Sequence, residues 1–109
     1  MTVAAEAHGV LLTTLPSQED ARRLAKLLVE EKLAACVQLV PIESFYRWEG
    51  KVQNEGEVLL LVKTRTALFD KAILRIKAAH PYSVPEIVGW PFSAGHLPYL
   101  DWIDEVTAG

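Results

Sequence analysis

The stretch SFYRWEGKVQNEGEVLLLVK, residues Ser44–Lys63, predicts a long β-hairpin. Its first arm, Ser44–Trp48, is rich in aromatic residues, and its second arm contains the apolar run Val58–Lys63. Aromatic and β-branched residues are typical of strands. Glu49-Gly50 lies between the arms and suits a turn, because glycine adopts backbone conformations that other residues avoid. We therefore expect two long strands that project beyond the rest of the sheet.

Shorter strands are predicted on both sides of this hairpin. Pro41 separates the first arm from the strand before it, and Gly56 inside the second arm predicts a bulge. Each of the remaining strand segments is short, mostly apolar and bounded by helix or turn signals. These strands are expected at His8–Leu15, Ala35–Val40 and Glu86–Trp90.

Three helices are expected between and after the strands. Ser17 is a typical N-cap, and Asp20 three residues later is typical of a capping box. His80-Pro81 ends the second helix, because the residue before proline is pushed out of helical geometry. The helices are predicted from Ser17 to near Lys32, over Thr66–Ala79 with Thr66 as cap, and over His96–Val106. Their apolar stripes include Val29 in the first and Tyr99, Leu100, Trp102 and Ile103 in the last.

The predicted order β-α-β-β-α-β is the split βαβ, or ferredoxin-like, arrangement. It predicts an α+β fold, with an antiparallel sheet, both long helices on one face and a short C-terminal helix. The other face of the sheet then has no cover within one chain, although strands this apolar need cover on both faces. We therefore expect an oligomer, built from a single domain over residues 8–109 that follows a flexible N-terminus at residues 1–7.

Composition excludes several functional classes. The 109 residues are 50% hydrophobic with a formal net charge of −3, which argues against disorder and against a nucleic-acid partner. No apolar run approaches the roughly 20 residues of a membrane-spanning helix, and the first residues do not resemble a signal peptide. Cys36 is the single cysteine, so no internal disulfide can form, and a cytoplasmic location is expected.

Several segments, in order and spacing, resemble the CutA family of divalent-cation tolerance proteins. They are TLPSQEDA (Thr14–Ala21), EEKLAACVQLVP (Glu30–Pro41), SFYRWEGK (Ser44–Lys51), EVLLLVKT (Glu57–Thr64), HPYSVPEI (His80–Ile87) and YLDWI (Tyr99–Ile103). The resemblance implies a ferredoxin-like fold, a tight homotrimer related in shape to the PII signalling proteins, and a cytoplasmic location. It also implies a connection with copper and other divalent cations.

His80 and Cys36 are the candidate metal ligands. Imidazole is a good ligand for copper, and a thiolate suits Cu(I). The alternative is that His80 caps a helix C-terminus and that Cys36 is a small buried apolar residue. Copper sites proposed in the family use a cysteine at the position of Thr13 and a histidine pair at Ala79 and His80. Because this chain has Thr13 and Ala79, only one of those three ligands is present.

A second group of residues is predicted to form a cleft or an interface. Tyr46 and Trp48 alternate along one strand and therefore project to the same side, as an interface anchor or as a ligand wall. In a trimer, a cleft between subunits could be lined by Tyr46, Trp48, Lys63, Tyr82 and Glu86, with His80 nearby.

Two functional hypotheses follow. The first is a trimeric divalent-cation tolerance protein that binds copper or another divalent ion and takes part in the response to metal ions. The second is a PII-like signalling or scaffold trimer whose intersubunit cleft binds a small organic ligand or a partner protein. An enzyme is not expected, because no triad or phosphate-binding loop is evident, and no cofactor is required.

Overall fold

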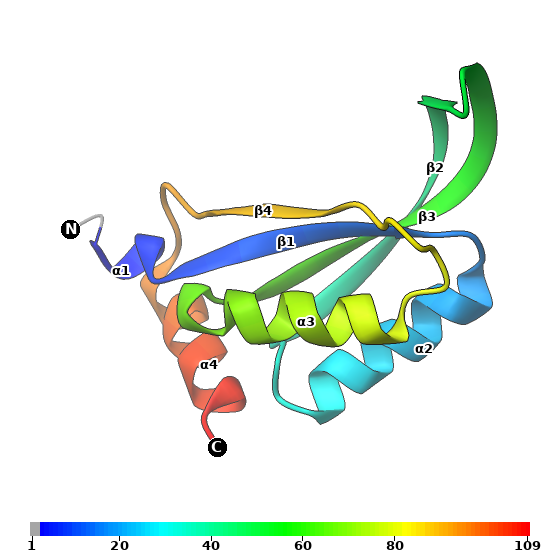
Figure 1. Ribbon diagram of the computed structural model, residues 1–109. Helices are drawn as coiled ribbons and strands as arrows, with labels where there is room; N and C mark the ends of the chain where they lie inside the picture. The colour runs from blue at the N-terminus through cyan, green and yellow to red at the C-terminus, as the bar shows by residue number, and fades with distance from the viewer. Residues whose placement is uncertain (1–2) are drawn as a thin grey trace.

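A computed structural model describes residues 3–109 as a four-stranded antiparallel sheet with helices packed against it (Figure 1). The elements are α1 (Val3–Glu6), β1 (His8–Leu15), α2 (Gln18–Glu30), β2 (Cys36–Trp48), β3 (Lys51–Arg65), a 3₁₀ turn (Thr66–Leu68), α3 (Phe69–Ala79), β4 (Ile87–Pro91) and α4 (Leu97–Thr107). The strands lie in the order β2-β3-β1-β4. The α+β, ferredoxin-like prediction is confirmed.

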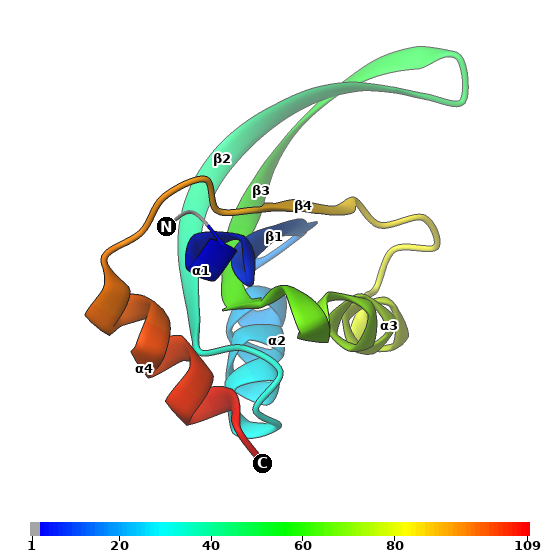
Figure 2. The ribbon, with the colours of Figure 1, turned by 90° about the vertical axis from the view of Figure 1, so that its left-hand side faces the viewer.

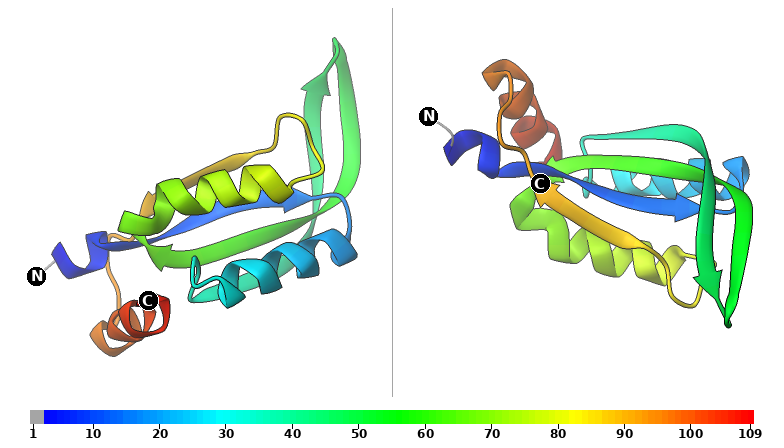
Figure 3. Two further views of the ribbon diagram at one scale, coloured as in Figure 1. Left: turned by 60° about the horizontal axis from the view of Figure 1, so that its bottom comes forward. Right: turned by 90° about the horizontal axis from the view of Figure 1, so that it is seen from above.

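Both long helices cover one face of the sheet. Figure 2 and the left view of Figure 3 show α2 and α3 on the same side. Side chains alternate across a strand, so every second residue of β1 and β3 faces these helices. The main core consists of Leu11, Leu15, Ala21, Leu24, Leu28, Ala34, Val58, Leu60, Val62, Ala72 and Ile76. No helix among residues 3–109 is both long and apolar enough to cross a bilayer.

The β2–β3 hairpin extends well past the end of β1. Its register runs without a break from Cys36 opposite Lys63 to Trp48 opposite Lys51. Glu49 and Gly50 form the connection, and both have positive φ angles, 51° and 77°. Two positive φ angles are typical of the type I′ turn, whose twist matches that of the flanking strands. The predicted hairpin is confirmed, and Figure 1 shows it curving away from the sheet.

Two predictions about the hairpin strands were wrong. β2 is one strand from Cys36 to Trp48 that includes Pro41, where a break was expected. β2 is an edge strand, and an edge strand tolerates proline because its outward-facing N–H groups need no partner within the sheet. Gly56 forms no bulge, since it pairs with Glu43 in an unshifted register.

The start of α2 agrees with the sequence prediction. The hydroxyl of Ser17 accepts a hydrogen bond from the backbone N–H of Asp20 at 3.1 Å. The helix ends at Glu30 rather than near Lys32, whose φ of 60° places it outside helical geometry. Val29 was predicted on the apolar stripe but is 44% exposed, because it lies beside the buried face and not on it.

The later elements differ from the prediction by small shifts. Thr66 starts a 3₁₀ turn instead of capping α3, and its hydroxyl donates to the carbonyl of Glu6 at 3.3 Å. β4 and α4 each begin and end one residue later than predicted. Within α4, Leu100 and Ile103 are buried as expected, whereas the predicted apolar residues Tyr99 and Trp102 remain partly exposed and contact each other.

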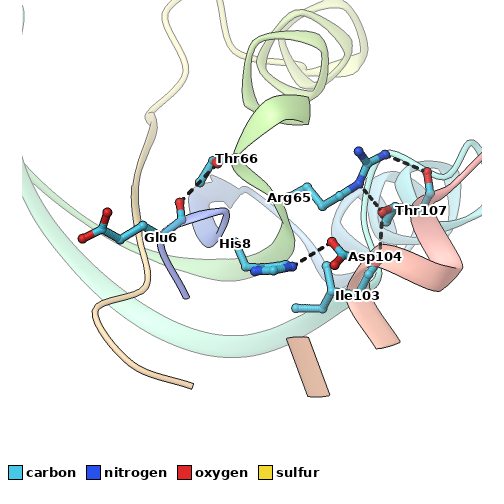
Figure 4. Close-up of polar contacts among 7 residues, drawn as sticks. All are labelled: Glu6, His8, Arg65, Thr66, Ile103, Asp104 and Thr107. Atoms are coloured by element: carbon cyan, nitrogen blue, oxygen red, sulfur yellow. Dashed lines mark hydrogen bonds and ion pairs between the residues drawn. The ribbon is translucent and has the colours of Figure 1, made fainter. Parts of the chain in front are cut away.

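Hydrogen bonds fasten α4 to the sheet (Figure 4). A ring nitrogen of His8 lies 2.8 Å from the carboxylate of Asp104. Arg65 donates to the hydroxyl of Thr107 at 2.8 Å and to its carbonyl at 3.1 Å. The same hydroxyl donates to the carbonyl of Ile103. These bonds join α4 to β1 and to the end of β3 within the chain.

A second apolar cluster lies beneath these bonds. Ala5, Ala35, Leu100 and Ile103 are buried together, with Phe92 and Val106 packed against them. The predicted flexible segment, residues 1–7, lies partly outside the described residues. Within the described part, residues 3–6 form α1, and Ala5 belongs to this cluster.

Candidate functional site

A hollow lies where the β2–β3 hairpin leaves the sheet. It has a volume of about 870 Å³ and is bounded by the hairpin and by the segment that links α3 to β4. We call it the hairpin groove. Its lining residues are Thr14, Glu43, Ser44, Phe45, Tyr46, Trp48, Glu55, Glu57, Pro81, Tyr82, Ser83, Val84 and Glu86. This volume is within the range of small-molecule binding sites.

The hairpin groove is acidic. Its lining contains four carboxylates and no lysine or arginine; the carboxylates are Glu43, Glu55, Glu57 and Glu86. Glu43 accepts a hydrogen bond from the amide of Asn54 at 3.1 Å, and Glu57 accepts one from the hydroxyl of Tyr82 at 2.9 Å. The ion pairs among residues 3–109 all involve other carboxylates. No carboxylate of the groove is therefore part of an ion pair among residues 3–109.

Aromatic rings form much of the remaining wall. Tyr46 and Trp48 are two residues apart on β2 and project to the same side. Trp48 is 49% exposed, and Phe45, on the same strand, is 70% exposed. Partial burial raises the pKa of Tyr46, and its hydrogen bond to Glu55 raises it further. A contiguous patch of exposed apolar side chains often marks an interaction site.

Tyr82 joins the two walls of the groove. Its hydroxyl reaches across from the segment after α3 to Glu57 on β3. Burial raises the pKa of Tyr82, and the adjacent Glu57 carboxylate raises it further. The phenol therefore stays protonated at neutral pH and remains a hydrogen-bond donor.

Both ring nitrogens of His80 are hydrogen-bonded, so His80 has no lone pair free for a metal. Its Nε2 lies 2.8 Å from the carbonyl of Thr14, and a carbonyl only accepts, so Nε2 carries the proton. Its Nδ1 accepts the backbone N–H of Tyr82 at 3.1 Å. Burial lowers the pKa of His80, and the bond to Thr14 partly offsets that effect. Metal binding by His80 would require one of these bonds to break.

Cys36 lies in a different part of the molecule. Cys36 faces Lys63 of β3 across the β2–β3 ladder. Thr14, which is hydrogen-bonded to His80, is paired with Leu59 of the same strand. Four residues of β3 separate those two positions, which is about 13 Å along the strand. The Cys36 thiol contacts Tyr99, whose pKa is raised by burial and further by the thiol. Cys36 and His80 are therefore not brought together within one chain.

The structure unites four of the five residues predicted to line a cleft. Tyr46, Trp48, Tyr82 and Glu86 all line the hairpin groove, whereas Lys63 does not. Three lining carboxylates were missed by sequence reasoning: Glu43, Glu55 and Glu57. Glu55 and Glu57 alternate along β3, a spacing that places them on one face and could have drawn attention to them.

No metal centre is preformed in the described chain. Residues 3–109 contain no group of three or more His, Cys, Asp or Glu side chains placed to hold a metal ion. Thr13 is fully buried. Its hydroxyl lacks a hydrogen-bond partner. The groove can thus attract a cation through charge, but one chain does not enclose a bare metal ion.

Comparisons with known proteins give a consistent result. The family model described as CutA1 divalent ion tolerance protein matches residues 9–106. The divalent-cation tolerance protein CutA of Thermus thermophilus is 57% identical over 99 residues, which are 90% of this chain and 96% of that protein. The structure of a CutA from Archaeoglobus fulgidus, described as a periplasmic divalent cation tolerance protein, superposes with a TM-score of 0.91. It is 44% identical, and the match covers 93% of this chain and 99% of the other.

Proposed function

Because the chain belongs to the CutA1 divalent ion tolerance family, we propose that it acts as a homotrimer that binds cationic ligands in the hairpin groove. The observation that carries this proposal is the acidic lining: four carboxylates and no basic side chain around one hollow. Uncompensated negative charge in a concave site raises the local concentration of cations. The role proposed is binding, with no reaction catalysed.

Copper or another divalent ion is the first candidate ligand, in keeping with the family. Carboxylate oxygens are suitable ligands for divalent ions, although copper prefers nitrogen and sulfur. Residues 3–109 offer no group of three metal-ligating side chains, and in this proposal a second subunit supplies further donors. In this proposal Glu86 contributes to binding, whereas His80 and Cys36 serve packing and hydrogen bonding.

Cu(II) titration against a weak competing chelator tests this assignment. We expect the parent to bind, Glu86→Gln to bind more weakly, and His80→Ala to retain binding if it folds. Circular dichroism of His80→Ala establishes folding beforehand. Loss of binding in folded His80→Ala, together with full binding in Glu86→Gln, would assign the metal site to His80 and contradict its assignment to the hairpin groove.

The trimer is supported by the uncovered face of the sheet. Helices α2 and α3 cover one side of the sheet (Figure 2). Val88 and Trp90 of β4, which alternate with Gly89 and so project to the other side, are 52% and 51% exposed. Val40 of β2 is also exposed. Apolar side chains on an open sheet face are stabilised when a second subunit removes them from water. Light scattering should give three times the chain mass of 12.1 kDa at micromolar concentration; the mass of a single chain would contradict the proposal.

A PII-like role for a small organic ligand is the second candidate. The aromatic walls of the groove favour it, because binding sites for organic molecules are mostly apolar with a few placed polar groups. Ligand-dependent melting separates the two candidates. Stabilisation by divalent ions supports the first, and stabilisation by small organic molecules supports the second.

The cytoplasm is the proposed location. The single cysteine is the supporting observation, because proteins of oxidising compartments commonly carry disulfide pairs. The A. fulgidus relative is described as periplasmic, so the location of this chain requires its own measurement. Cell fractionation followed by immunoblotting provides it, and recovery outside the cytoplasmic fraction would contradict the proposal.

A further inference from the structure

We infer that His80 is a pH-dependent switch for residues 81–86, the loop between α3 and β4: the neutral imidazole holds this loop in place, and the protonated imidazole releases it. We call residues 81–86 the α3–β4 loop. The contacts that carry the inference are all made within one chain. It therefore does not depend on ligand binding in the hairpin groove or on the proposed trimer.

The α3–β4 loop is held by side chains of the helix end that precedes it. In the described chain, none of residues 81–86 makes a backbone–backbone hydrogen bond. Instead, the backbone N–H of Tyr82 donates to Nδ1 of His80 at 3.1 Å, and the carbonyl of Ser83 accepts from Nζ of Lys77 at 3.1 Å. The bond from Lys77 is exposed to solvent, whereas the bond to His80 is partly buried. The position of the loop therefore depends on the state of the imidazole.

The imidazole can hold the loop only in its neutral form. Nε2 donates its hydrogen to the carbonyl of Thr14 at 2.8 Å, which leaves the lone pair of Nδ1 for the N–H of Tyr82. Protonation places a hydrogen on both nitrogens, so that two N–H donors then point at each other at Nδ1. It also leaves a cation in a site where His80 is only 9% exposed. Movement of the loop away from the ring relieves both costs.

Tyr82 carries the effect from the loop to the sheet. Its ring lies against the imidazole, with the ring centroids 5.0 Å apart and the planes tilted by 46°. Its hydroxyl donates to Glu57 of β3 at 2.9 Å. When the Tyr82 N–H loses its acceptor, the same residue is displaced from the ring and from Glu57. Protonation of His80 thus loosens the connection between the α3–β4 loop and β3.

Groups on several elements set the pH at which this happens. Burial has the largest effect and lowers the pKa of His80, while the bond to the Thr14 carbonyl of β1 raises it. Among the charged side chains, Lys77 of α3 lowers this pKa, and Asp20 of α2 and Glu57 of β3 raise it. The net result is a pKa below the usual value of 6.5. The loop is therefore held at neutral pH and released as the pH falls.

An NMR titration of the full chain from about pH 7.5 to about pH 4.5 tests the inference, because this range spans the usual pKa of histidine. At the upper end, the ring nitrogens of His80 should show a hydrogen on Nε2 and none on Nδ1. On acidification, the amides of Tyr82 and Ser83 should shift with the same midpoint as the ring. From about pH 6.5 down to that midpoint, the exchange protection of the Tyr82 amide, corrected for intrinsic exchange, should fall by up to about tenfold per pH unit.

Matched variants assign the response to His80. His80→Gln retains an N–H for the Thr14 carbonyl and a carbonyl oxygen for the Tyr82 N–H, but it takes up no proton in this range. His96→Gln makes the same change at the exposed residue before α4 and is the control. We expect the loop response to disappear in His80→Gln and to stay unchanged in His96→Gln. A response retained in folded His80→Gln, or lost in His96→Gln, overturns the assignment.

The parent chain alone decides the question if His80→Gln does not fold. A hydrogen on Nδ1 at about pH 7.5 overturns the inference, because Nδ1 must then be a donor. Loop amides that do not follow the ring overturn it as well. A transition shared by the amides of α2 is unfolding of the whole chain and overturns a local switch. Ring and loop amides that titrate together while the α2 amides stay unchanged support it.

Discussion

The two ends of the sheet differ in how their polar side chains are satisfied. At the end covered by α4, His8 contacts Asp104, and Arg65 makes two hydrogen bonds to Thr107, so partners come from the same chain (Figure 4). At the hairpin end, carboxylates meet only neutral donors and aromatic rings remain accessible. The first end is held together by hydrogen bonds within the chain. In the proposed function, the second end binds a ligand, a second subunit or both.

The largest expected effect is in the apolar cluster under α4. Ile103 is fully buried, so Ile103→Ala should lower the free energy of unfolding by about 2–5 kcal/mol. Val84, at the hairpin end, is 72% exposed, and Val84→Ala should stay within about 0.5 kcal/mol. Urea unfolding at one fixed protein concentration measures both. Similar losses in the free energy of unfolding of the two variants would contradict the proposed difference between the two ends of the sheet.

The next effect concerns assembly. If Trp48 anchors another subunit, Trp48→Ala should weaken the trimer by about 2 kcal/mol or more, and dilution should release smaller species. Trp102→Ala, at the opposite end on α4, is the matched control. Light scattering over a dilution series measures the change. Unchanged mass and unchanged melting temperature in Trp48→Ala would show that Trp48 does not stabilise a subunit interface.

A smaller effect is expected at Arg65. Lysine cannot reproduce the two hydrogen bonds that the guanidinium makes to Thr107, so Arg65→Lys should cost about 1 kcal/mol. Arg23→Lys, in an exposed pair on α2, should cost close to nothing. Hydrogen exchange of the α4 amides provides the local measurement. Protection of α4 that does not change in Arg65→Lys would argue against its role in fastening the helix.

The smallest effect is the pH dependence contributed by His80. Its pKa is lowered in the folded state, so the unfolded chain takes up the proton first as the pH falls. The contribution is therefore fully present above the unfolded pKa of about 6.5 and is lost as the pH falls through the folded pKa. Unfolding of the parent and of His80→Gln between neutral and acidic pH measures it. Parallel stability curves for the two proteins would contradict the prediction.

Sequence patterns predicted the elements whose causes are local. The Ser17 cap and the Glu49-Gly50 turn depend on neighbouring residues only, and both are confirmed. Pro41 was misread as a strand break, because whether a strand tolerates proline depends on its position in the sheet. That position is set by the strand order, which a local pattern does not contain.

The candidate site was predicted in part for the same reason. Tyr46 and Trp48 were found because two aromatic residues at alternate positions are conspicuous. Glu57 was missed, since its place in the groove depends on the bond to Tyr82, which is 25 residues away in sequence. Lys63 was predicted in a cleft between subunits; within one chain it does not line the groove, because the register places it opposite Cys36 at the other end of the ladder.

Pro41 affects how a strand of another chain can add to the edge of this sheet. It lies within the outermost strand, where every outward N–H is available for strand addition. The proline ring offers no N–H at that position, so the rim of the sheet is divided into two short segments, residues 36–40 and 42–48. An incoming strand that runs along both segments finds no N–H donor at Pro41. Open-ended stacking of sheets is thereby restricted, while a closed assembly that uses one segment per subunit remains allowed.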